Sequence, residues 1–441
     1  MELDFANKLT NMNARWKDAY FLSSKRFTLF GPKGSGKTRI AQDFARSHKN
    51  VFYLSFEHHT PETALAQFCR MYLPEHEDIH NWDDAVKAFL AERRSGIKLI
   101  IFEDEQNDAM EQCRSAFHSG KGGMRNLVFC SISRSSKHTD RNNVEANYLT
   151  ITDVCKCFPA YAKQDAVRLQ ALTGGIPAIL KELDSEADYE KNVRKLLSYD
   201  SAFSTLLPQW LKDCFRSPES YYPILKSISD GRRRLSEIAK DIGFPNNKCG
   251  KYLEALIEHD FVRAEKPQEA KQATYHIANS YFAAWCRYVY GKKQQQIMTP
   301  DTLFDFVGQD INNSLAIPEF HNACLRYLQS AKYELSRRVH NAQPKEIKKS
   351  VPVTLKDGSQ VILDYCVLKK GDALFCVFPH SLTMRYTKEE MERIYEAVQQ
   401  YERFYNAHIA VFSLERFSDW CVHESSLNSQ LYLVTMERLK H

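Results

Sequence analysis

Apolar positions in the first third of the chain group into short runs, and the longer stretches between them have a helical spacing. The apolar runs are Phe27 to Phe30, Val51 to Phe56, Lys98 to Phe102, Asn126 to Cys130 and Tyr148 to Ile151. Glu62 to Tyr72 and Trp82 to Arg93 are examples of the helical spacing. Apolar strands that alternate with helices are typical of a parallel sheet with crossover connections. The pattern predicts an α/β unit over residues 1–155.

The pattern then becomes helical from Pro159 to about Leu197. It is interrupted at Gly174-Gly175-Ile176-Pro177, where one helix must end and another must begin. We interpret residues 156–215 as a helical lid on the α/β unit.

Three further helices are predicted at Tyr222 to Ser229, Leu235 to Ile242 and Asn247 to Glu258. The segment Phe261 to Ile277 can supply two short strands after them. Three helices followed by a two-stranded wing form a winged helix-turn-helix, which we place at residues 216–292.

A polar stretch, Lys292 to Gln296, separates this segment from the last part of the chain. Residues 300–441 mix helical patterns with strands at Val361 to Leu368 and Ala373 to Phe378. The fold class predicted for the whole chain is therefore α/β: a parallel sheet with a helical lid, a winged helix, and a smaller α/β domain.

Composition agrees with a folded protein of several domains. The chain has 441 residues, 43% of them hydrophobic and 26% charged, and about 150 residues per domain gives roughly three domains. The net charge of +5 is too mild to identify a nucleic-acid partner.

Cysteines and termini bear on the compartment. The 12 cysteines show no zinc-like spacing, and only Cys155 and Cys157 lie close together, so they are expected to be reduced thiols. Glu2 and Asp4 stand where a signal peptide would be basic. No apolar stretch approaches the roughly 18 residues of a membrane span. We expect a cytoplasmic protein with no membrane association.

A complete G-x-x-x-x-G-K-[ST] phosphate loop follows the first apolar run. Its residues are Gly31, Pro32, Lys33, Gly34, Ser35, Gly36, Lys37 and Thr38. In this motif the backbone N–H groups surround the phosphates, the lysine reaches the β and γ phosphates, and the final hydroxyl ligates Mg²⁺. The helix predicted over Thr38 to Ser47 turns its positive N-terminus toward the same anion. The sequence predicts binding of ATP with Mg²⁺, with Arg39 as a further contact.

An acidic cluster follows the strand at Lys98 to Phe102. Glu103, Asp104 and Glu105 stand at its end, the arrangement that holds Mg²⁺ and polarises a water. In one register Asp104 holds the metal and Glu105 activates the water. In the other register Glu103 holds the metal and Asp104 activates the water, and the shorter carboxylate would make hydrolysis slow. The sequence leaves both registers open.

The strand at Asn126 to Cys130 leads into Ser133 and Arg134. Their position is the carboxyl edge of the sheet, where phosphates bind. Arg134 can sense the γ phosphate or neutralise transition-state charge. A solvated loop arginine is the alternative.

Taken in order, these features resemble the archaeal-type ATPases, a branch of the STAND signalling ATPases. The features are the phosphate loop, the acid-tipped strand ending in Gln106, Ser133-Arg134, Gly174-Gly175-Ile176-Pro177 and the winged helix. The resemblance covers roughly residues 1–290. It implies that the Gly-Gly-x-Pro element lies near the nucleotide and couples its state to the winged helix, so Gly175 and Pro177 are candidate contacts.

Members of this family often end in a domain similar to restriction endonucleases. Asp364 matches the strand acid of such a domain. Cys376-Val377-Phe378 stands where Glu-x-Lys belongs, and Phe320-His321 replaces the Phe-Glu of the first helix. Because the metal site depends on the missing groups, we predict a nuclease-like fold without cleavage activity. An unrelated α/β interaction domain is the alternative.

The winged helix carries Lys248 and Lys251 on its third helix, and Arg232-Arg233-Arg234 precedes its second. These residues could contact the DNA backbone. Glu254, Glu258 and Asp260 offset their charge. Docking of this module against its own ATPase is therefore an equal alternative.

The function predicted from the sequence is a slowly hydrolysing, STAND-like switch whose ATP or ADP state controls engagement of a protein partner or DNA. One alternative is an ATP-dependent DNA-binding regulator or loader. Another is a working Mg²⁺-dependent nuclease in which Asp364 acts with unrecognised acids. The stimulus, the partner and the oligomeric state stay open.

Overall fold

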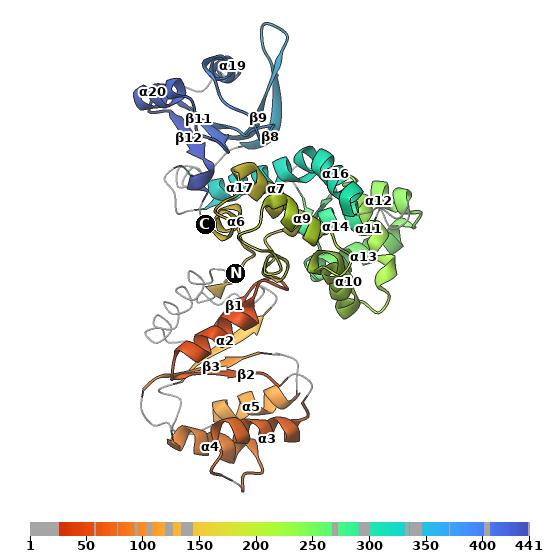
Figure 1. Ribbon diagram of the computed structural model, residues 1–441, viewed down its shortest axis with the longest axis vertical. Helices are drawn as coiled ribbons and strands as arrows, with labels where there is room; N and C mark the ends of the chain where they lie inside the picture. Colours follow the sequence, from red (N-terminus) through yellow and green to blue (C-terminus); the bar gives the residue numbers. More distant parts are fainter. Residues whose placement is uncertain are drawn as a thin grey trace. The chain divides into compact units, whose positions relative to one another are not determined.

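The structure is a computed structural model. It describes residues 26–56, 59–76, 78–92, 96–103, 108–119, 127–133, 144–266, 272–290, 300–330, 335, 346–369, 371–400 and 406–439. The chain divides into two compact units between Tyr148 and Leu149, and Figure 1 shows the helices and strands of each. Across the described ranges, no helix has the length and apolar character needed to cross a membrane.

The amino-terminal unit is built on a five-stranded sheet with the order β2-β3-β4-β1-β5. Its strands are β1 (Arg26–Phe30), β2 (Val51–Leu54), β3 (Lys98–Phe102), β4 (Leu127–Ser133) and β5 (Val144–Glu145). Every pair of neighbours is parallel. The parallel sheet predicted from the apolar runs is confirmed.

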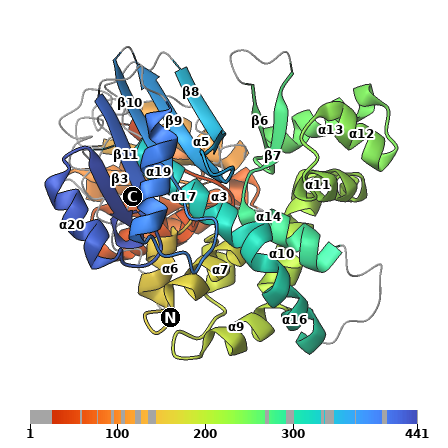
Figure 2. The same ribbon diagram turned by 90° about the horizontal axis from the view of Figure 1, so that it is seen from above.

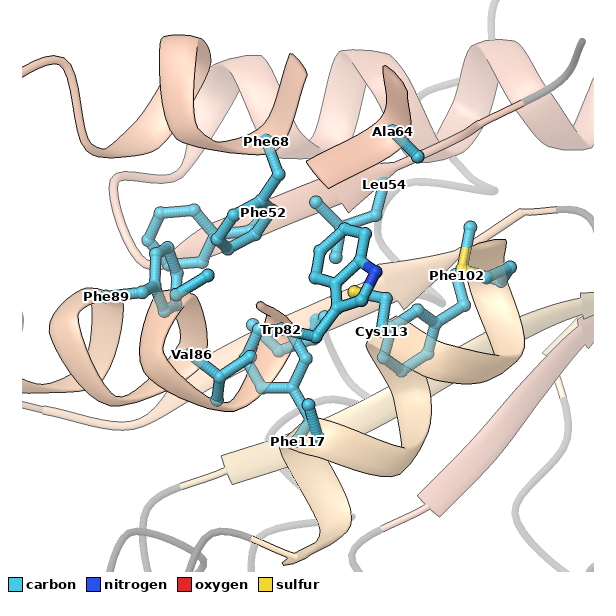
Figure 3. Close-up of a cluster of buried hydrophobic side chains, with 14 of the residues drawn as sticks. Phe52, Leu54, Ala64, Phe68, Trp82, Val86, Phe89, Phe102, Cys113 and Phe117 are labelled. Atoms are coloured by element: carbon cyan, nitrogen blue, oxygen red, sulfur yellow. The ribbon is translucent and has the colours of Figure 1, made fainter. Parts of the chain in front are cut away.

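Within the described part of this unit, four helices accompany the sheet. They are α2 (Lys37–Ser47), α3 (Pro61–Tyr72), α4 (Trp82–Glu92) and α5 (Asp108–Ser119). Helices α3, α4 and α5 lie together beside β2 and β3 (Figure 1). Their apolar faces meet the sheet in an aromatic cluster that includes Phe52, Phe68, Trp82 and Phe89 (Figure 3). This core holds β3, the strand that Glu103 follows, through Ile100 and Phe102.

The strand predicted at Tyr148 to Ile151 is wrong. The fifth strand is Val144–Glu145, and Ile151 begins helix α6 (Ile151–Cys157). Thr150 and Asp153 cap this helix reciprocally, each side chain accepting the backbone N–H of the other residue. A capping box specifies a helix start, so the apolar run is a turn into a helix. The compact amino-terminal unit ends at Tyr148, before this helix.

The carboxyl-terminal unit begins with short helices. They are α6, α7 (Lys163–Thr173), α8 (Pro177–Leu180), α9 (Tyr189–Leu196) and α10 (Ala202–Cys214). Gly174 ends α7 in a left-handed conformation, and Pro177 begins α8. The predicted helix break at Gly174-Gly175-Ile176-Pro177 is confirmed.

Residues 222–277, here called the helix–hairpin segment, follow the short helix η2 (Pro218–Ser220). The segment contains α11 (Tyr222–Ser229), α12 (Leu235–Ile242), α13 (Asn246–Glu258), β6 (Val262–Glu265) and β7 (Thr274–Ile277). Strands β6 and β7 are antiparallel, and the three helices lie beside them (Figure 2). Leu253 and Leu256 of α13 are buried, as their helical spacing requires. Each predicted element is present within a residue or two of its expected bounds.

More helices connect this segment to the last sheet. They are α14 (Ser280–Trp285), η3 (Cys286–Tyr290), α16 (Pro300–Ile311), η4 (Asn312–Ala316) and α17 (Ile317–Gln329). In η4, Asn312 Oδ1 accepts a hydrogen bond of 2.9 Å from Arg168 on α7. The connecting helices are thereby linked to the helices that follow Leu149.

The last sheet has the order β12-β11-β10-β9-β8. Its strands are β8 (Glu346–Thr354), β9 (Gln360–Lys369), β10 (Asp372–Val377), β11 (Asn406–Ser413) and β12 (Leu431–Thr435). The pairs from β8 to β10 are antiparallel, and those from β10 to β12 are parallel. Helices α19 (Lys388–Gln399) and α20 (Asp419–Leu427) and the short η5 (Met436–Arg438) complete this mixed domain.

Candidate nucleotide site

The phosphate loop connects the end of β1 to the start of α2. Gly36 is the N-cap residue of α2, and Lys37 is its first helical residue. The N–H groups of the first turn of a helix have no partners within the helix and attract anions. The strand, loop and helix predicted from the motif are therefore all present.

The Lys37 ammonium is held inside the loop. Nζ donates hydrogen bonds to the Gly31 carbonyl at 2.7 Å and the Pro32 carbonyl at 2.8 Å. Lys37 is only 9% exposed, and a buried charge requires such acceptors. These bonds place Nζ against the backbone of the first two residues of the loop.

Thr38 and Glu103 are brought together by the sheet. The Thr38 hydroxyl donates a hydrogen bond to the Glu103 carboxylate. Glu103 directly follows β3, and its N–H donates to the Leu54 carbonyl at 2.9 Å. The Thr38 hydroxyl and the Glu103 carboxylate therefore meet at one edge of the sheet, although β4 lies between β1 and β3.

Asp104, Glu105 and Arg134 lie outside the described residues, so their roles stay predictions. Ser133, the residue before Arg134, accepts a hydrogen bond of 3.3 Å from Gly31 N through its carbonyl. Arg39 is exposed on α2, and its Nε lies 3.4 Å from the Asp43 carboxylate. Its predicted contact with nucleotide also stays a prediction.

Two residues that the sequence analysis missed lie against the loop. Ala146 N donates to the Phe30 carbonyl at 2.7 Å, and a Cβ on Gly31 would lie 2.2 Å from the Ala146 carbonyl oxygen. The Tyr148 hydroxyl donates to the Lys33 carbonyl at 2.7 Å. No motif marks these residues. The one signal was the apolar run that was mistaken for a strand.

The Gly-Gly-x-Pro element lies in the carboxyl-terminal unit. Gly175 accepts a 2.9 Å hydrogen bond from Leu149 N, and Gly174 accepts a 3.0 Å bond from the Asn279 amide. Pro177 is buried in the first turn of α8. Contact of Gly175 and Pro177 with nucleotide stays a prediction.

The sheet of the last domain buries a carboxyl group. Asp364 on β9 is 8% exposed, and its Oδ2 accepts a 2.7 Å hydrogen bond from Phe378 N. Burial raises the pKa of Asp364 to about 6, although that hydrogen bond acts in the opposite direction. His380 Nε2 lies 3.7 Å from the same oxygen. The carboxyl therefore has a histidine neighbour that the sequence analysis did not identify.

Cys376 and His321 occupy positions that the sequence analysis compared with a nuclease site. Cys376 on β10 is fully buried, and burial raises the pKa of its thiol. His321 donates from Nε2 to the Pro379 carbonyl at 2.8 Å. Glu319 is buried and lies 3.2 Å from Arg326. Among the described residues, no three His, Cys, Asp or Glu side chains are arranged to hold a metal ion.

Several basic side chains of the helix–hairpin segment have intramolecular contacts. Lys248 Nζ lies 4.3 Å from the centroid of the Phe244 ring. Arg232 lies 3.7 Å from Asp241, and the Arg233 guanidinium donates to the Ile228 carbonyl at 2.9 Å. Arg234 and Lys251 are exposed.

Comparisons with known proteins identify one curated relative and several weakly similar structures. No protein-family model matches the chain. It is 28% identical over 145 residues to the uncharacterized protein MJECL04 of Methanocaldococcus jannaschii, a match that covers 30% of this chain and 31% of that protein. The chain therefore spans about a third of the length of this relative.

Solved structures resemble the chain only weakly. Drosophila ORC bound to DNA matches with a TM-score of 0.28 and 11% identity, over 66% of this chain and 87% of that chain. Protein VC1899 from Vibrio cholerae matches with a TM-score of 0.21 and 9% identity, over 95% and 96% of the two chains. PCH-2 of C. elegans matches with a TM-score of 0.23 and 12% identity, over 58% and 67%. TM-scores this low assign neither fold nor function, so the functional assignment depends on the residues of the site.

Proposed function

We propose that this protein is a molecular switch that binds ATP with Mg²⁺ and hydrolyses it slowly. The hydrogen bond from Thr38 to Glu103 is the observation that carries the proposal. It joins the hydroxyl of a complete phosphate-loop motif to a carboxylate, and these are the oxygen groups that Mg²⁺ prefers in a nucleotide site.

Each residue of the site has a proposed task. Lys37 binds the β and γ phosphates, and the N-terminus of α2 faces the same charge. Thr38 and Glu103 would hold Mg²⁺, which neutralises the charge that develops on the phosphate oxygens. Arg134 senses the γ phosphate.

The contact of Glu103 with Thr38 favours the register in which Glu103 belongs to the metal and Asp104 activates the water. The aspartate carboxylate is one methylene shorter than the glutamate that would act in the other register. A shorter reach places the base farther from the water that it must orient. We therefore propose that the switch stays in its ATP form for long periods.

The parts of the chain after the amino-terminal unit respond to whether ATP or ADP is bound. We propose that residues 156–215 form a lid, that the helix–hairpin segment is the core of a winged helix at residues 216–292, and that residues 300–441 are nuclease-like but inactive. Buried Cys376 supports inactivity, since no lysine or acid occupies its position. A protein partner or DNA is the proposed target of the switch.

The proposed function is tested by isothermal titration with ATP, with and without Mg²⁺, together with ATP turnover. Wild-type protein should bind ATP more tightly with Mg²⁺ and release phosphate slowly. The Lys37→Ala variant should neither bind ATP nor release phosphate. Absence of ATP binding by the wild-type protein defeats the proposal.

A DNA-binding regulator is the second candidate, and one observation favours it. Lys251 on α13, Arg263 on β6 and Lys266 directly after β6 are all exposed. Phosphate contacts release counterions, so DNA affinity should fall steeply as salt rises. A salt-dependent gel shift and DNA-stimulated turnover support this candidate, and indifference to DNA supports a switch that acts on a protein.

A further inference from the structure

Residues 146–149, here called the connecting segment, contact the phosphate loop at one end and the Gly174-Gly175 turn at the other. We propose that Tyr148 is a positioning residue that transmits nucleotide binding from the phosphate loop to the carboxyl-terminal unit. This inference rests on the proposed function, because it requires that the loop binds ATP.

The first end of the connecting segment is hydrogen-bonded to the phosphate loop and to the residue before it. Ala146 N donates to Phe30 O at 2.7 Å, one residue before the loop begins. A side chain at Gly31 would collide with the Ala146 carbonyl, 2.2 Å away. Tyr148 then donates its hydroxyl to the Lys33 carbonyl at 2.7 Å. The segment is thus bonded on both sides of Gly31, and a shift of the loop backbone must move it or break these contacts.

The other end of the segment is held as closely. Leu149 N donates to the Gly175 carbonyl at 2.9 Å, and the Gln170 amide donates to the Leu149 carbonyl at 3.1 Å. A Cβ on Gly175 would lie 1.9 Å from the Leu149 carbonyl oxygen. The N–H and the carbonyl of Leu149 therefore both form hydrogen bonds within the carboxyl-terminal unit.

The Gly174-Gly175 turn continues this connection to the base of the hairpin. The Asn279 amide donates to the Gly174 carbonyl at 3.0 Å, and its Oδ1 caps α14 by accepting from Tyr281 N at 2.9 Å. Ala278 N donates to the Phe261 carbonyl at 3.0 Å, beside β6. Turn, helix α14 and hairpin are thus joined by hydrogen bonds to the main chain.

Each of these bonds lies within one unit, and the Tyr148–Leu149 peptide bond joins the two sets. Because a peptide bond is planar and short, the main chain of Leu149 must move when the main chain of Tyr148 is displaced. The hydroxyl of Tyr148, the last residue of the amino-terminal unit, donates a hydrogen bond to the loop. Removing this hydroxyl therefore tests the proposed connection.

The test compares Tyr148→Phe with Tyr72→Phe in the full chain. The first variant keeps the ring and loses only the hydroxyl. Tyr72 is a matched control because its hydroxyl also donates to a main-chain carbonyl, that of Tyr53, at 3.1 Å in the same unit. The readout is exchange of the Leu149 and Gly175 amides by mass spectrometry, with and without saturating Mg²⁺-ATP, beside ATP titration of each protein.

We expect ATP to slow exchange of these amides about tenfold in the wild-type protein and in Tyr72→Phe. In Tyr148→Phe the effect should fall to about twofold, because one hydrogen bond contributes roughly a fivefold change in an equilibrium, while ATP still binds. Retention of the full ATP effect in Tyr148→Phe overturns the inference, and so does wild-type protein that binds ATP without a change in exchange. Failure of the wild-type protein to bind ATP instead refutes the proposed function.

Discussion

The hydroxyl of Thr38 and the carboxylate of Glu103 are hydrogen-bonded, although Thr38 follows β1 and Glu103 follows β3. Strand β4 lies between these strands in the sheet. The contact therefore depends on how far each side chain reaches across the carboxyl edge of the sheet. The proposed assignment of Glu103 to the metal rests on this contact.

Glu103→Gln should weaken Mg²⁺-dependent ATP binding about 10- to 100-fold, because a ligand position loses its charge. Affinity measured in excess EDTA should change little. Glu105→Gln is the control and should bind Mg²⁺-ATP normally, whereas Asp104→Asn should bind it and lose turnover. If Asp104→Asn loses Mg²⁺-dependent binding and Glu103→Gln does not, the other register is correct, and Glu105→Gln should then bind Mg²⁺-ATP and lose turnover.

Lys37→Ala should abolish ATP binding while leaving the fold intact. The Lys37 ammonium donates to the carbonyls of Gly31 and Pro32, so its loss acts on the loop rather than on the apolar core. Circular dichroism should be unchanged, and titration calorimetry should detect no ATP binding. Unchanged affinity would contradict the assignment of this loop.

Asp364→Asn should stabilise the carboxyl-terminal unit at neutral pH. The pKa of Asp364 is about 6 in the folded protein and 3.8 in the unfolded chain, so the folded state binds more protons between these values. The stability of the wild-type protein should therefore fall as pH rises from about 4 to 6 and then level off. The variant should not show this loss, and its free energy of unfolding at pH 7.5 should exceed that of the wild-type protein by about 1–3 kcal/mol.

Thermal unfolding between pH 4 and 7.5 measures this dependence. Asp357 is a control with the opposite sign, because hydrogen bonds from Ser359 lower the pKa of its exposed carboxyl. Asp357→Asn should lose stability at neutral pH. A destabilised Asp364→Asn protein at pH 7.5 would show that the ionised carboxylate stabilises the fold, and would contradict the prediction.

Asn279→Ala should lower the free energy of unfolding by about 1–2 kcal/mol, because it removes the cap of α14 and the donor to Gly174. Asn279→Ser should fall between this variant and the wild-type protein, since a serine can cap the helix but lacks the amide donor. Chemical denaturation gives the three values. Equal stability of Asn279→Ala and wild type would show that the turn does not depend on this residue.

Plasmid DNA incubated with the protein and Mg²⁺ should remain uncut. The expectation follows from Cys376, whose buried thiol cannot replace a lysine or an acid at a metal site. Agarose gels with wild-type protein and Asp364→Ala provide the measurement. Mg²⁺-dependent cutting that disappears in the variant would show that the domain is a nuclease after all.

Local signals predicted much of the fold. The helices Tyr222–Ser229 and Leu235–Ile242 occur at their predicted bounds, because Asp230-Gly231 and Gly243 mark where they end. The run from Tyr148 to Ile151 misled the prediction, since buried apolar residues next to a helix cap resemble a short strand.

The candidate site was predictable only in part. The phosphate-loop motif identified Lys37 and Thr38, because all of its residues are consecutive. The partnership of Thr38 with Glu103 depends on side-chain positions across a sheet, and the bond from Tyr148 to Lys33 joins residues 115 positions apart. Neither leaves a periodic or local pattern in a single sequence.

The position of β1 in the sheet has a consequence for folding. This strand pairs with β4 and β5, which come much later in the chain. Long-range parallel pairing is slow, because a large loop must close before the contacts form. The phosphate loop is among the first described residues to be synthesised, yet the described strands that pair with β1 are synthesised about 100 residues later. A nascent chain that ends before β4 therefore carries the complete phosphate-loop motif on a strand that lacks both of these neighbours.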